Sequence, residues 1–380
     1  MHVPFCQSKC IYCDFYVELD KYGGQEAHVA YTRALEREIR ARFEHAGDYL
    51  SPVESVYVGG GTPSLLSARE YQHLFDVIGQ YVPFHSDAEL TLEANPMAMA
   101  DGPEAYLEVA GFNRLSIGVQ SLDEEELKRL SRLHTARQAM DFVYRMGEAG
   151  FRNLSIDLMY GIPGQSAKSW ANTLERVSAL NIQHVSMYGL KVEDGTPLST
   201  ILDHPRGRDR YQLPEDELAV QMYFDGIDAL ESSGFSLYEF SNLAKPGFSS
   251  NHNLNYWSNG FYWAFGASAH GYVPVPGGVP VRYENVRNLP AYLENPLSGQ
   301  TQPCPSEEQL ENAIIFGLRK SDGINITSLE RQFQFNFFER YGWIFEKYSD
   351  TDWLVCSNGN VRLSRKAIPL SNNILADFLG

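Results

Sequence analysis

The chain has 380 residues, with 31 lysines and arginines against 48 aspartates and glutamates, so its formal net charge is −17 at pH 7. This balance argues against a nucleic-acid-binding protein, because phosphate recognition draws its affinity from clusters of Lys and Arg. Five cysteines are too few for a disulfide framework, and no apolar run approaches the about 20 residues of a transmembrane helix, so we expect a cytoplasmic protein without a membrane span.

Strand-like segments alternate with helical patterns through the first half of the chain. These segments are rich in β-branched and aromatic residues and span 2–5, 55–58, 89–92, 114–119, 153–160 and 184–190. Their apolar residues are continuous rather than alternating, which is typical of strands buried on both faces. Apolar residues recur at helical spacing over 123–133 and 137–149, and less regularly over 166–180. Six strand–helix units predict an α/β fold with a parallel sheet, either doubly wound or curled into a barrel.

Residues with unusual chemistry stand just after these strands. They occupy residues 6–13, 59–64, 93–96, 120–121 and 161–165. In both architectures the functional site lies at the carboxyl ends of the parallel strands. The sequence therefore predicts that these segments meet at one edge of the sheet.

The second half of the chain begins with a long helical pattern over 215–232. A Gly- and aromatic-rich stretch over 238–272 has little regular periodicity, and the Pro/Gly segment 273–280 after it is typical of a loop. We expect residues 1–215 to form the main domain and residues 216–300 to form an extension that flanks it.

The last segment, residues 301–380, predicts a small domain of a different kind. Residues 306–309 and 327–330 both fit the capping-box pattern that opens a helix. The run Ser357-Asn358-Gly359-Asn360 predicts a tight hairpin between two short strands. Helices followed by a hairpin indicate a winged-helix-like domain. Because acidic residues outnumber basic ones in it, we expect this domain to dock on the main domain rather than bind DNA.

Three of the five cysteines, Cys6, Cys10 and Cys13, lie close together directly after the first strand. A structural zinc site needs four ligands, and His2 is the nearby residue that could complete one. Three thiolates can instead hold three irons of a 4Fe-4S cluster and leave the fourth iron open to a ligand. Three buried free cysteines are the remaining alternative, against which the density of thiols in so short a segment argues.

The spacing of these cysteines, with Tyr12 between the last two, resembles the motif of the radical S-adenosylmethionine (SAM) superfamily. The resemblance implies a partial parallel (β/α)6 barrel in which Cys6, Cys10 and Cys13 ligate a 4Fe-4S cluster. It also implies that SAM chelates the open iron and that electron transfer cleaves its sulfonium to a 5′-deoxyadenosyl radical. The cofactor would then carry the hard chemistry, and the protein would supply positioning and electrostatics.

The later strand ends supply residues that the same resemblance assigns to SAM. The glycine run within 59–64 lets the backbone approach a ligand closely, and Glu93 can pair with the positively charged end of SAM. Arg132 offers a planar fork for its carboxylate, and Asp157 can accept hydrogen bonds from ribose hydroxyls. The full set implied for SAM is Tyr12, Gly60, Gly61, Thr62, Glu93, Gln120, Arg132, Asp157 and Lys191.

Motifs over nearly the whole chain resemble one group of the superfamily, the oxygen-independent coproporphyrinogen III oxidase group. They stand at residues 59–64, 93–96, 116–121, 157–165 and 239–247. The group contains a dehydrogenase, which decarboxylates two propionates of coproporphyrinogen III, and a branch of haem chaperones.

Three features favour the haem-chaperone branch. The dehydrogenase has a fourth cysteine two residues after the third, where this chain has Phe15. The dehydrogenase also carries an N-terminal extension, whereas five residues precede Cys6 here. The run His252-Asn253-Leu254-Asn255-Tyr256-Trp257 matches the signature of the chaperone branch. The resemblance therefore implies delivery of haem to apoproteins, with the dehydrogenase of porphyrin biosynthesis as the alternative.

The signature also makes chemical sense as a haem site. Neutral imidazole is a common axial ligand of haem iron, so His252 is the candidate ligand. Tyr256 and Trp257 offer flat apolar faces to a macrocycle. A histidine that is satisfied within an aromatic core loop is the alternative. The implied partners are haem or a porphyrin, haem-accepting apoproteins and a flavodoxin- or ferredoxin-type reductant.

Overall fold

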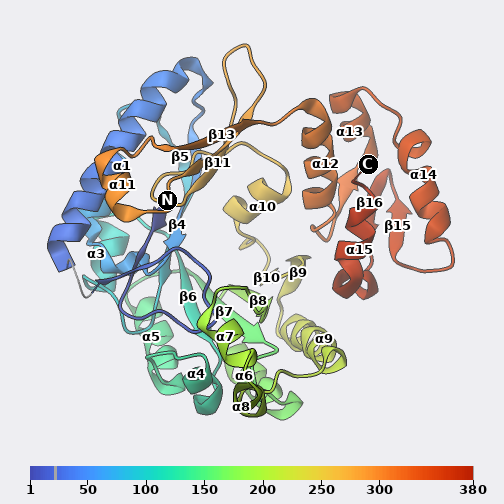
Figure 1. Ribbon diagram of the computed structural model, residues 1–380, viewed down its shortest axis with the longest axis horizontal. Coiled ribbons are helices and arrows are strands. Elements are labelled where there is room, and N and C mark those ends of the chain that lie inside the picture. Colours follow the sequence, from blue (N-terminus) through green and yellow to red (C-terminus); the bar gives the residue numbers. More distant parts are fainter. Residues whose placement is uncertain (21–23, 380) are drawn as a thin grey trace.

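Six parallel strands form the centre of the fold (Figure 1). In the computed structural model, which describes residues 1–20 and 24–379, the large sheet has the order β1-β4-β5-β6-β7-β8-β10-β9. The parallel strands are β1 (His2–Val3), β4 (Val53–Gly60), β5 (Phe84–Ala94), β6 (Arg114–Gln120), β7 (Asn153–Tyr160) and β8 (His184–Gly189). β10 (Asn242–Ala244) and β9 (Ser236–Glu239) extend the sheet in the antiparallel direction. The six predicted strands are confirmed, in an open sheet that ends at β1 and β9.

The first strand is shorter than predicted. Pro4, which has no N–H to donate, separates β1 from β2 (Phe5–Cys6). β2 pairs in parallel with β3 (Glu18–Leu19), outside the large sheet. The loop between β2 and β3 therefore leaves the sheet, and it carries the remaining two of the clustered cysteines.

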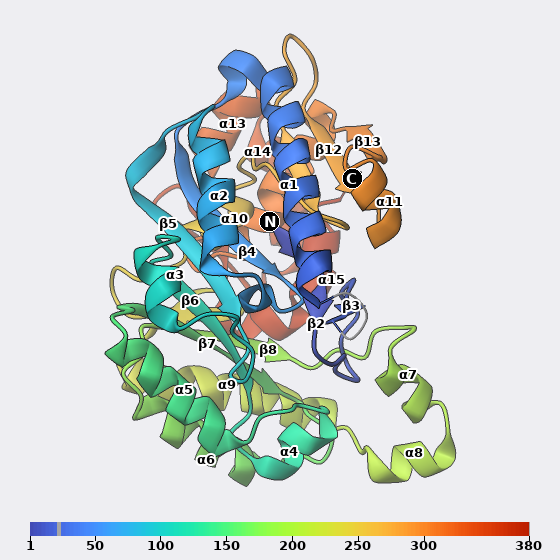
Figure 2. The same cartoon turned by 90° about the vertical axis from the view of Figure 1, so that its left-hand side faces the viewer.

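Helices cover the outer face of the large sheet, with α1 and α2 side by side (Figure 2). The helices that follow the strands are α1 (Gly24–Ala46), α2 (Ala68–Gly79), α3 (Pro103–Glu108), α4 (Glu124–Arg129), α5 (Ala136–Glu148), α6 (Ala167–Ser178) and α9 (Asp216–Ser232). Capping boxes at Ser67, Thr135 and Ser166 begin α2, α5 and α6. The apolar faces of these helices, with Phe142 and Trp170 among them, meet the outward side chains of the strands in one core.

The strands alternate in chemistry, although both of their faces are buried. Outward residues such as Val58 and Ile117 join the apolar core. The strand register brings polar side chains together on the inner face: Ser55, Tyr57, Glu89, Thr91, Glu93, Arg114, Ser116, Ser155, Asp157, His184 and Ser186. The expectation of continuous apolar strands is therefore wrong, because the inner face carries polar side chains that line the interior and meet the start of α10.

The segment 238–272, expected to be irregular, contains regular elements. β10 belongs to the large sheet, and the short helix α10 (Asn251–Trp257) contacts both β4 and the C-terminal helix α12 (Ser306–Gly317). Figure 1 shows α10 between the large sheet and the C-terminal domain. Sequence periodicity missed α10 because a helix of two turns offers too short a pattern to recognise.

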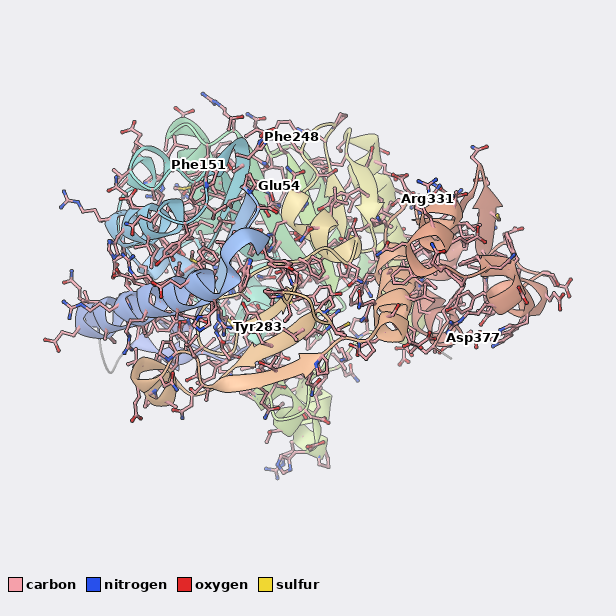
Figure 3. The ribbon with its side chains drawn as sticks, turned by 90° about the horizontal axis from the view of Figure 1, so that it is seen from above. Glu54, Phe151, Phe248, Tyr283, Arg331 and Asp377 are labelled. Carbon is pink, nitrogen blue, oxygen red and sulfur yellow. The ribbon has the colours of Figure 1, made fainter. Side chains whose placement is uncertain are left out.

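A second, three-stranded antiparallel sheet follows α10. It consists of β11 (His270–Val273), β12 (Val281–Asn285) and β13 (Gly299–Pro303), and Tyr283 lies in its middle strand (Figure 3). The predicted loop 273–280 connects β11 to β12. Shorter helices elsewhere in the chain are α7 (Pro197–Leu202) and α8 (Pro205–Arg210), which follow β8, and α11 (Leu289–Glu294), which lies between β12 and β13. Of these, α7 and α8 project away from the sheet (Figure 2).

The C-terminal domain has the predicted helices and hairpin, and Arg331 and Asp377 lie in it in Figure 3. After α12 it contains β14 (Ile324–Asn325), α13 (Ile326–Phe333), α14 (Phe337–Lys347), β15 (Leu354–Ser357), β16 (Asn360–Leu363) and α15 (Ser371–Ala376). Asn358 and Gly359 have φ values of 53° and 76° between β15 and β16, as a two-residue type I′ turn requires. The tight hairpin is confirmed.

Neither predicted capping box begins its helix. The N-cap of α12 is Pro305, so Ser306 already lies in the helix and makes no cap bond. The N-cap of α13 is Asn325, whose Oδ1 accepts from the Ser328 N–H at 2.9 Å. Both capping-box predictions are wrong because the helices begin earlier than the motifs suggest, where a proline and an asparagine fit the extended cap position.

Backbone hydrogen bonds and one buried side chain connect the large sheet to the C-terminal domain. Phe240, directly after β9, is buried among the apolar side chains of the C-terminal domain. Its N–H donates to the Arg319 carbonyl at 3.2 Å, and the Ser321 N–H donates to the Tyr238 carbonyl at 3.0 Å. The domain docks on the main part of the chain, while the boundaries at residues 215 and 300 stay predictions. Within the described residues, no helix combines the length and apolar character that crossing a membrane requires.

Candidate functional site

A cavity of about 540 Å³ lies at the carboxyl ends of the parallel strands. The residues predicted for a cluster and for SAM all line it: Cys6, Cys10, Tyr12, Cys13, Gly60, Gly61, Thr62, Glu93, Gln120, Arg132, Asp157 and Lys191. Residues 161–165 do not line it, and Gln165 instead donates to Glu126 Oε2 at 3.1 Å. The structure therefore brings together every predicted segment except the last.

The cluster loop, residues 6–13, forms one wall of the cavity. Cys6 is buried, with its Sγ 3.5 Å from Thr62 Oγ1, and the Cys13 N–H donates to the Cys10 carbonyl at 3.2 Å. Burial raises the pKa of Cys6 to about 11 and also raises the pKa of Cys13. The thiolate is the form that binds metal, so iron binding here must displace protons.

The three thiols of the cluster loop face one cavity without meeting at a point. Within residues 1–20 and 24–379, no three His, Cys, Asp or Glu side chains are arranged to hold a single metal ion. The cysteines of a cubane cluster each bind a different iron, so they surround the cluster instead of converging on one ion. Arg132 Nη1 lies 3.5 Å from Cys10 Sγ and places a positive charge beside the sulfur.

The glycine run at the end of β4 allows the chain to pack closely on its neighbours. Gly60 has a φ of 112°, a backbone conformation that residues with a Cβ rarely adopt. A Cβ on Gly61 would lie 2.6 Å from the Phe5 carbonyl oxygen. A Cβ on Gly59 would lie 2.8 Å from the Glu93 carboxylate. The sequence argument explained these glycines by the approach of a ligand. The structure shows that packing within the protein also requires them, since without side chains they let β4 pass between β2 and the Glu93 carboxylate.

Glu93 is held by two donors from β4. The Tyr57 hydroxyl donates to Oε1 at 2.8 Å, and the Gly60 N–H donates to Oε2 at 3.0 Å. Burial, together with the nearby charge of Asp157, raises the pKa of Glu93 to about 7. Burial also raises the pKa of Asp157, whose Oδ1 accepts from Ser116 Oγ at 3.1 Å. Two buried carboxyls with raised pKa values in one cavity form a site in which a bound cation would stabilise the ionised forms.

Arg132 and Gln120 line the same cavity as these carboxyls. Gln120 has a φ of 68° at a bulge in the pairing of β6 with β7. A bulge re-aims the side chain of the residue that it contains. Arg132 donates from Nη2 to the Gly118 carbonyl at 2.6 Å and to Asn95 Oδ1, while its buried Nε has no partner. A guanidinium with an unpaired N–H and two carboxyls in one cavity fit a ligand with both an amino group and a carboxylate, such as the amino-acid end of SAM.

Several cavity residues escaped the sequence argument as individual residues. Tyr57, Asn95, Ser116 and Tyr188 all line the cavity. The signal that could have found them is the polar residue at every second position of the strands, as in Ser55-Val56-Tyr57-Val58. The alternation is hard to recognise in the sequence, because the apolar side chains that face the helices make each strand apolar on average.

The rim of the cavity is partly apolar and partly charged. Phe15, which stands where the dehydrogenase has its fourth cysteine, lines the cavity and is 58% exposed. Lys191 lies in the lining as well, and its Nζ is 2.7 Å from Glu193 Oε1. The mouth therefore offers an aromatic face and an exposed ion pair next to the cluster loop.

The three residues of the predicted haem motif do not line this cavity and point to different neighbours. His252 Nδ1 is 2.9 Å from Ser55 Oγ, and its Nε2 is 3.0 Å from the Tyr256 hydroxyl. Burial lowers the pKa of His252 to about 3, so the imidazole is neutral. The Trp257 ring lies 4.8 Å below the Arg319 guanidinium of the C-terminal domain. Haem ligation by His252 stays a prediction, and both ring nitrogens have protein partners in this arrangement.

Comparisons with known proteins cover the whole chain. The family model of the radical SAM superfamily matches residues 1–177, and that of the HemN C-terminal domain matches residues 304–370. The chain is 33% identical to the protein named Heme chaperone HemW of Lactococcus lactis over 384 residues, which cover 100% of this chain and 96% of that protein. It is 33% identical to Heme chaperone HemW of Bacillus subtilis over 387 residues, which cover 100% of this chain and 98% of that protein.

Among solved structures, Escherichia coli HemN, described as a coproporphyrinogen III oxidase and a radical SAM enzyme, matches with a TM-score of 0.80. This match covers 99% of the chain and 88% of HemN at 21% identity, so it establishes a shared fold. The family models and the two full-length relatives agree with the cavity of cysteines, glycines and carboxyls described above. The chain therefore belongs to the HemW family of radical SAM proteins.

Proposed function

We propose that this protein is a haem chaperone that binds a 4Fe-4S cluster, SAM and haem and delivers haem to apoproteins. The observation that carries the proposal is the full-length similarity to two proteins named Heme chaperone HemW, at 33% identity each. Its support in the structure is the cavity into which the cluster loop and the ends of β4, β5, β6, β7 and β8 project.

Cys6, Cys10 and Cys13 are the proposed cluster ligands, and all three line the same cavity as the proposed SAM residues. When bound, the cluster and SAM supply one-electron chemistry that no side chain provides. Burial of Cys6 would limit the access of water to a bound cluster, and the Arg132 guanidinium beside Cys10 would offset part of the negative charge of the thiolates.

The opposite walls of the cavity are the proposed SAM site. Glu93 would accept from the amino group of SAM, and Arg132 with Gln120 would hold the carboxylate. Asp157 would accept from the ribose hydroxyls, as carboxylates do when two neighbouring hydroxyls are presented. The remaining proposed SAM contacts are Tyr12, Gly60, Gly61, Thr62 and Lys191.

His252, Tyr256 and Trp257 are the proposed haem residues. Iron ligation by His252 Nε2 requires that the nitrogen release the Tyr256 hydroxyl, 3.0 Å away. A neutral imidazole, which the low pKa of His252 ensures, is the form that binds haem iron. Haem capture is therefore proposed to open the contact between α10 residues that the haem-free protein maintains.

The proposal includes a reductant of the flavodoxin or ferredoxin type and a cytoplasmic location. An exposed Phe15 beside the cluster loop supports docking of an electron donor close to the cluster. A reducing compartment is supported by the need for three thiolates, because an oxidising one converts neighbouring thiols to disulfides.

An anaerobic experiment on the reconstituted protein tests the proposal against the dehydrogenase alternative. We expect stoichiometric binding of added haem, transfer of that haem to an apo-haem protein, and no conversion of coproporphyrinogen III in the presence of SAM and a reductant. Conversion to protoporphyrinogen would contradict the chaperone proposal. Haem binding that is unchanged in His252→Ala would contradict the ligand assignment alone.

A further inference from the structure

The helix that carries the predicted haem motif is anchored to the inner face of the large sheet. Glu89 on β5 accepts from three donors at the start of α10, namely Ser250 Oγ at 2.9 Å, the Asn251 N–H at 3.1 Å and the His252 N–H at 3.2 Å. A buried carboxylate with three donors at a helix start fixes that helix firmly. The position of the His252 ring over β4 is therefore set by the sheet.

The His252 ring packs directly on a residue of the cavity wall. It stacks on Tyr57 with ring centroids 5.2 Å apart and an angle of 22° between the planes. Ser55, two residues before Tyr57 on the same strand face, lies 2.9 Å from His252 Nδ1 and holds the imidazole in this orientation. Tyr57 lines the cavity, whereas His252 lies behind it.

Tyr57 in turn holds the carboxylate proposed to accept from the SAM amino group. Its hydroxyl donates to Glu93 Oε1 at 2.8 Å, and the Gly60 N–H fixes the other oxygen at 3.0 Å. A tyrosine ring can swing about its χ1 and χ2 torsions unless neighbours restrict it. The neighbour that covers the ring face of Tyr57 is His252.

We infer that His252 is a positioning residue of the SAM site, which holds the Tyr57 ring so that its hydroxyl fixes the Glu93 carboxylate. The inference rests on the proposed function, since it takes Glu93 as the group that binds the SAM amino group. It adds a role for His252 in the haem-free protein that is separate from iron ligation. The motif predicted for haem is by this reasoning also part of the support of the SAM site.

The test measures the dissociation constant of SAM for the anaerobic, cluster-loaded protein, followed through the spectrum of the cluster. We expect Tyr57→Phe, which keeps the stacked ring but loses the donor to Glu93, to weaken SAM binding about tenfold, equivalent to about 1.4 kcal/mol. His252→Ala is expected to weaken it about fivefold to tenfold. The double variant is expected to be no weaker than Tyr57→Phe alone, because His252 acts through the Tyr57 hydroxyl.

The chain offers a matched control in a second buried histidine of the same interior. His184 Nδ1 is 2.8 Å from Ser155 Oγ, and its Nε2 is 2.8 Å from the Tyr238 hydroxyl. His184 thus has the same kinds of partner as His252, and its ring neighbour is Tyr238 instead of Tyr57. We expect His184→Ala to leave the SAM dissociation constant within twofold of the wild-type value.

Each result distinguishes this inference from the proposed function. Equal weakening in His184→Ala, additive losses in the double variant, or an unchanged dissociation constant in His252→Ala overturns the positioning role while leaving the proposed function intact. A wild-type protein that does not bind SAM overturns both. If His252→Ala does not fold, His252→Gln removes the ring from Tyr57 but keeps a polar group near Ser55, and the same weakening is expected. A haem titration of the same variants reports iron ligation independently of SAM.

Discussion

Acidification is expected to weaken SAM binding through Glu93. Burial and the charge of Asp157 raise the pKa of this carboxyl to about 7 in the SAM-free protein. The N–H groups of the SAM amino group donate to the ionised form, so binding lowers this pKa and releases a proton. Affinity is therefore expected to fall as pH decreases through 7, because the neutral carboxyl is the poorer acceptor.

The size of the effect follows from the fraction of Glu93 that is ionised. With a pKa of about 7, about one tenth of the carboxyl is ionised at pH 6. The apparent dissociation constant of SAM at pH 6 is then about tenfold above its high-pH value, which corresponds to about 1.4 kcal/mol. Asp157 contributes to the raised pKa, so Asp157→Asn is expected to shift the midpoint of the profile below pH 7.

Anaerobic SAM titrations between pH 6 and pH 9 measure this profile. The ligand has its own α-amino group, which loses its proton at about pH 8, and that change is common to all variants. The diagnostic quantity is thus the difference between wild type and Glu93→Gln, which is expected to bind more weakly and to lose the dependence below pH 7. A wild-type profile that is flat between pH 6 and pH 8, or one that Glu93→Gln reproduces, would refute the assignment of Glu93.

Three further expectations concern the cluster and the C-terminal domain. Cys10→Ala is expected to abolish the visible absorbance of the reconstituted cluster, whereas Cys356→Ala, at an exposed free thiol, keeps the full iron content; equal iron in both would remove the cluster assignment. Asn325→Ala is expected to lower the free energy of unfolding by about 1 kcal/mol because Asn325 caps α13, and Thr327→Ala, at the motif residue that does not cap, is expected to have little effect in denaturant titrations. Gly359→Ala is expected to destabilise the domain by about 1 kcal/mol, because the φ of 76° strains any side chain, and an unchanged unfolding midpoint would contradict the turn assignment.

The cavity could be predicted from the sequence because most of its residues follow the ends of parallel strands. Each strand of a parallel sheet delivers its last residues to the same edge, so Cys6, Thr62, Glu93 and Gln120 could be placed together without knowledge of distances. The sequence also predicted the β15–β16 hairpin, because an Asn-Gly turn is determined by its own two residues. Local rules of this kind need no information from distant parts of the chain.

The polar inner face of the sheet could not be predicted from local patterns, because it depends on how the strands pair. In the sequence Tyr57 and Ser116 lie in segments that are apolar on average. Only the strand register shows that they line the site beside Glu93 and Asp157. The start of α10 is likewise fixed by Glu89, more than 150 residues earlier in the chain. Residue spacing cannot anticipate a cap that comes from another strand.

The partners of His252 also could not be read from its motif. The sequence correctly identified a histidine in an aromatic environment but could not tell an open imidazole from one whose nitrogens are both engaged. Its partners Ser55 and Tyr57 lie on β4, nearly 200 residues away. Tertiary contacts of this length decide whether a motif residue is available to a ligand.

The insertion of Phe240 into the C-terminal core has a consequence for dissecting the protein. The segment 304–370, which matches a family model, lacks this side chain and the backbone partners that Tyr238 and Phe240 provide. Expressed alone, it would leave an apolar gap in its core, and the remaining barrel would expose Phe240 to water. We therefore expect the two parts to unfold as one unit, with a single transition in denaturant titrations of the whole chain.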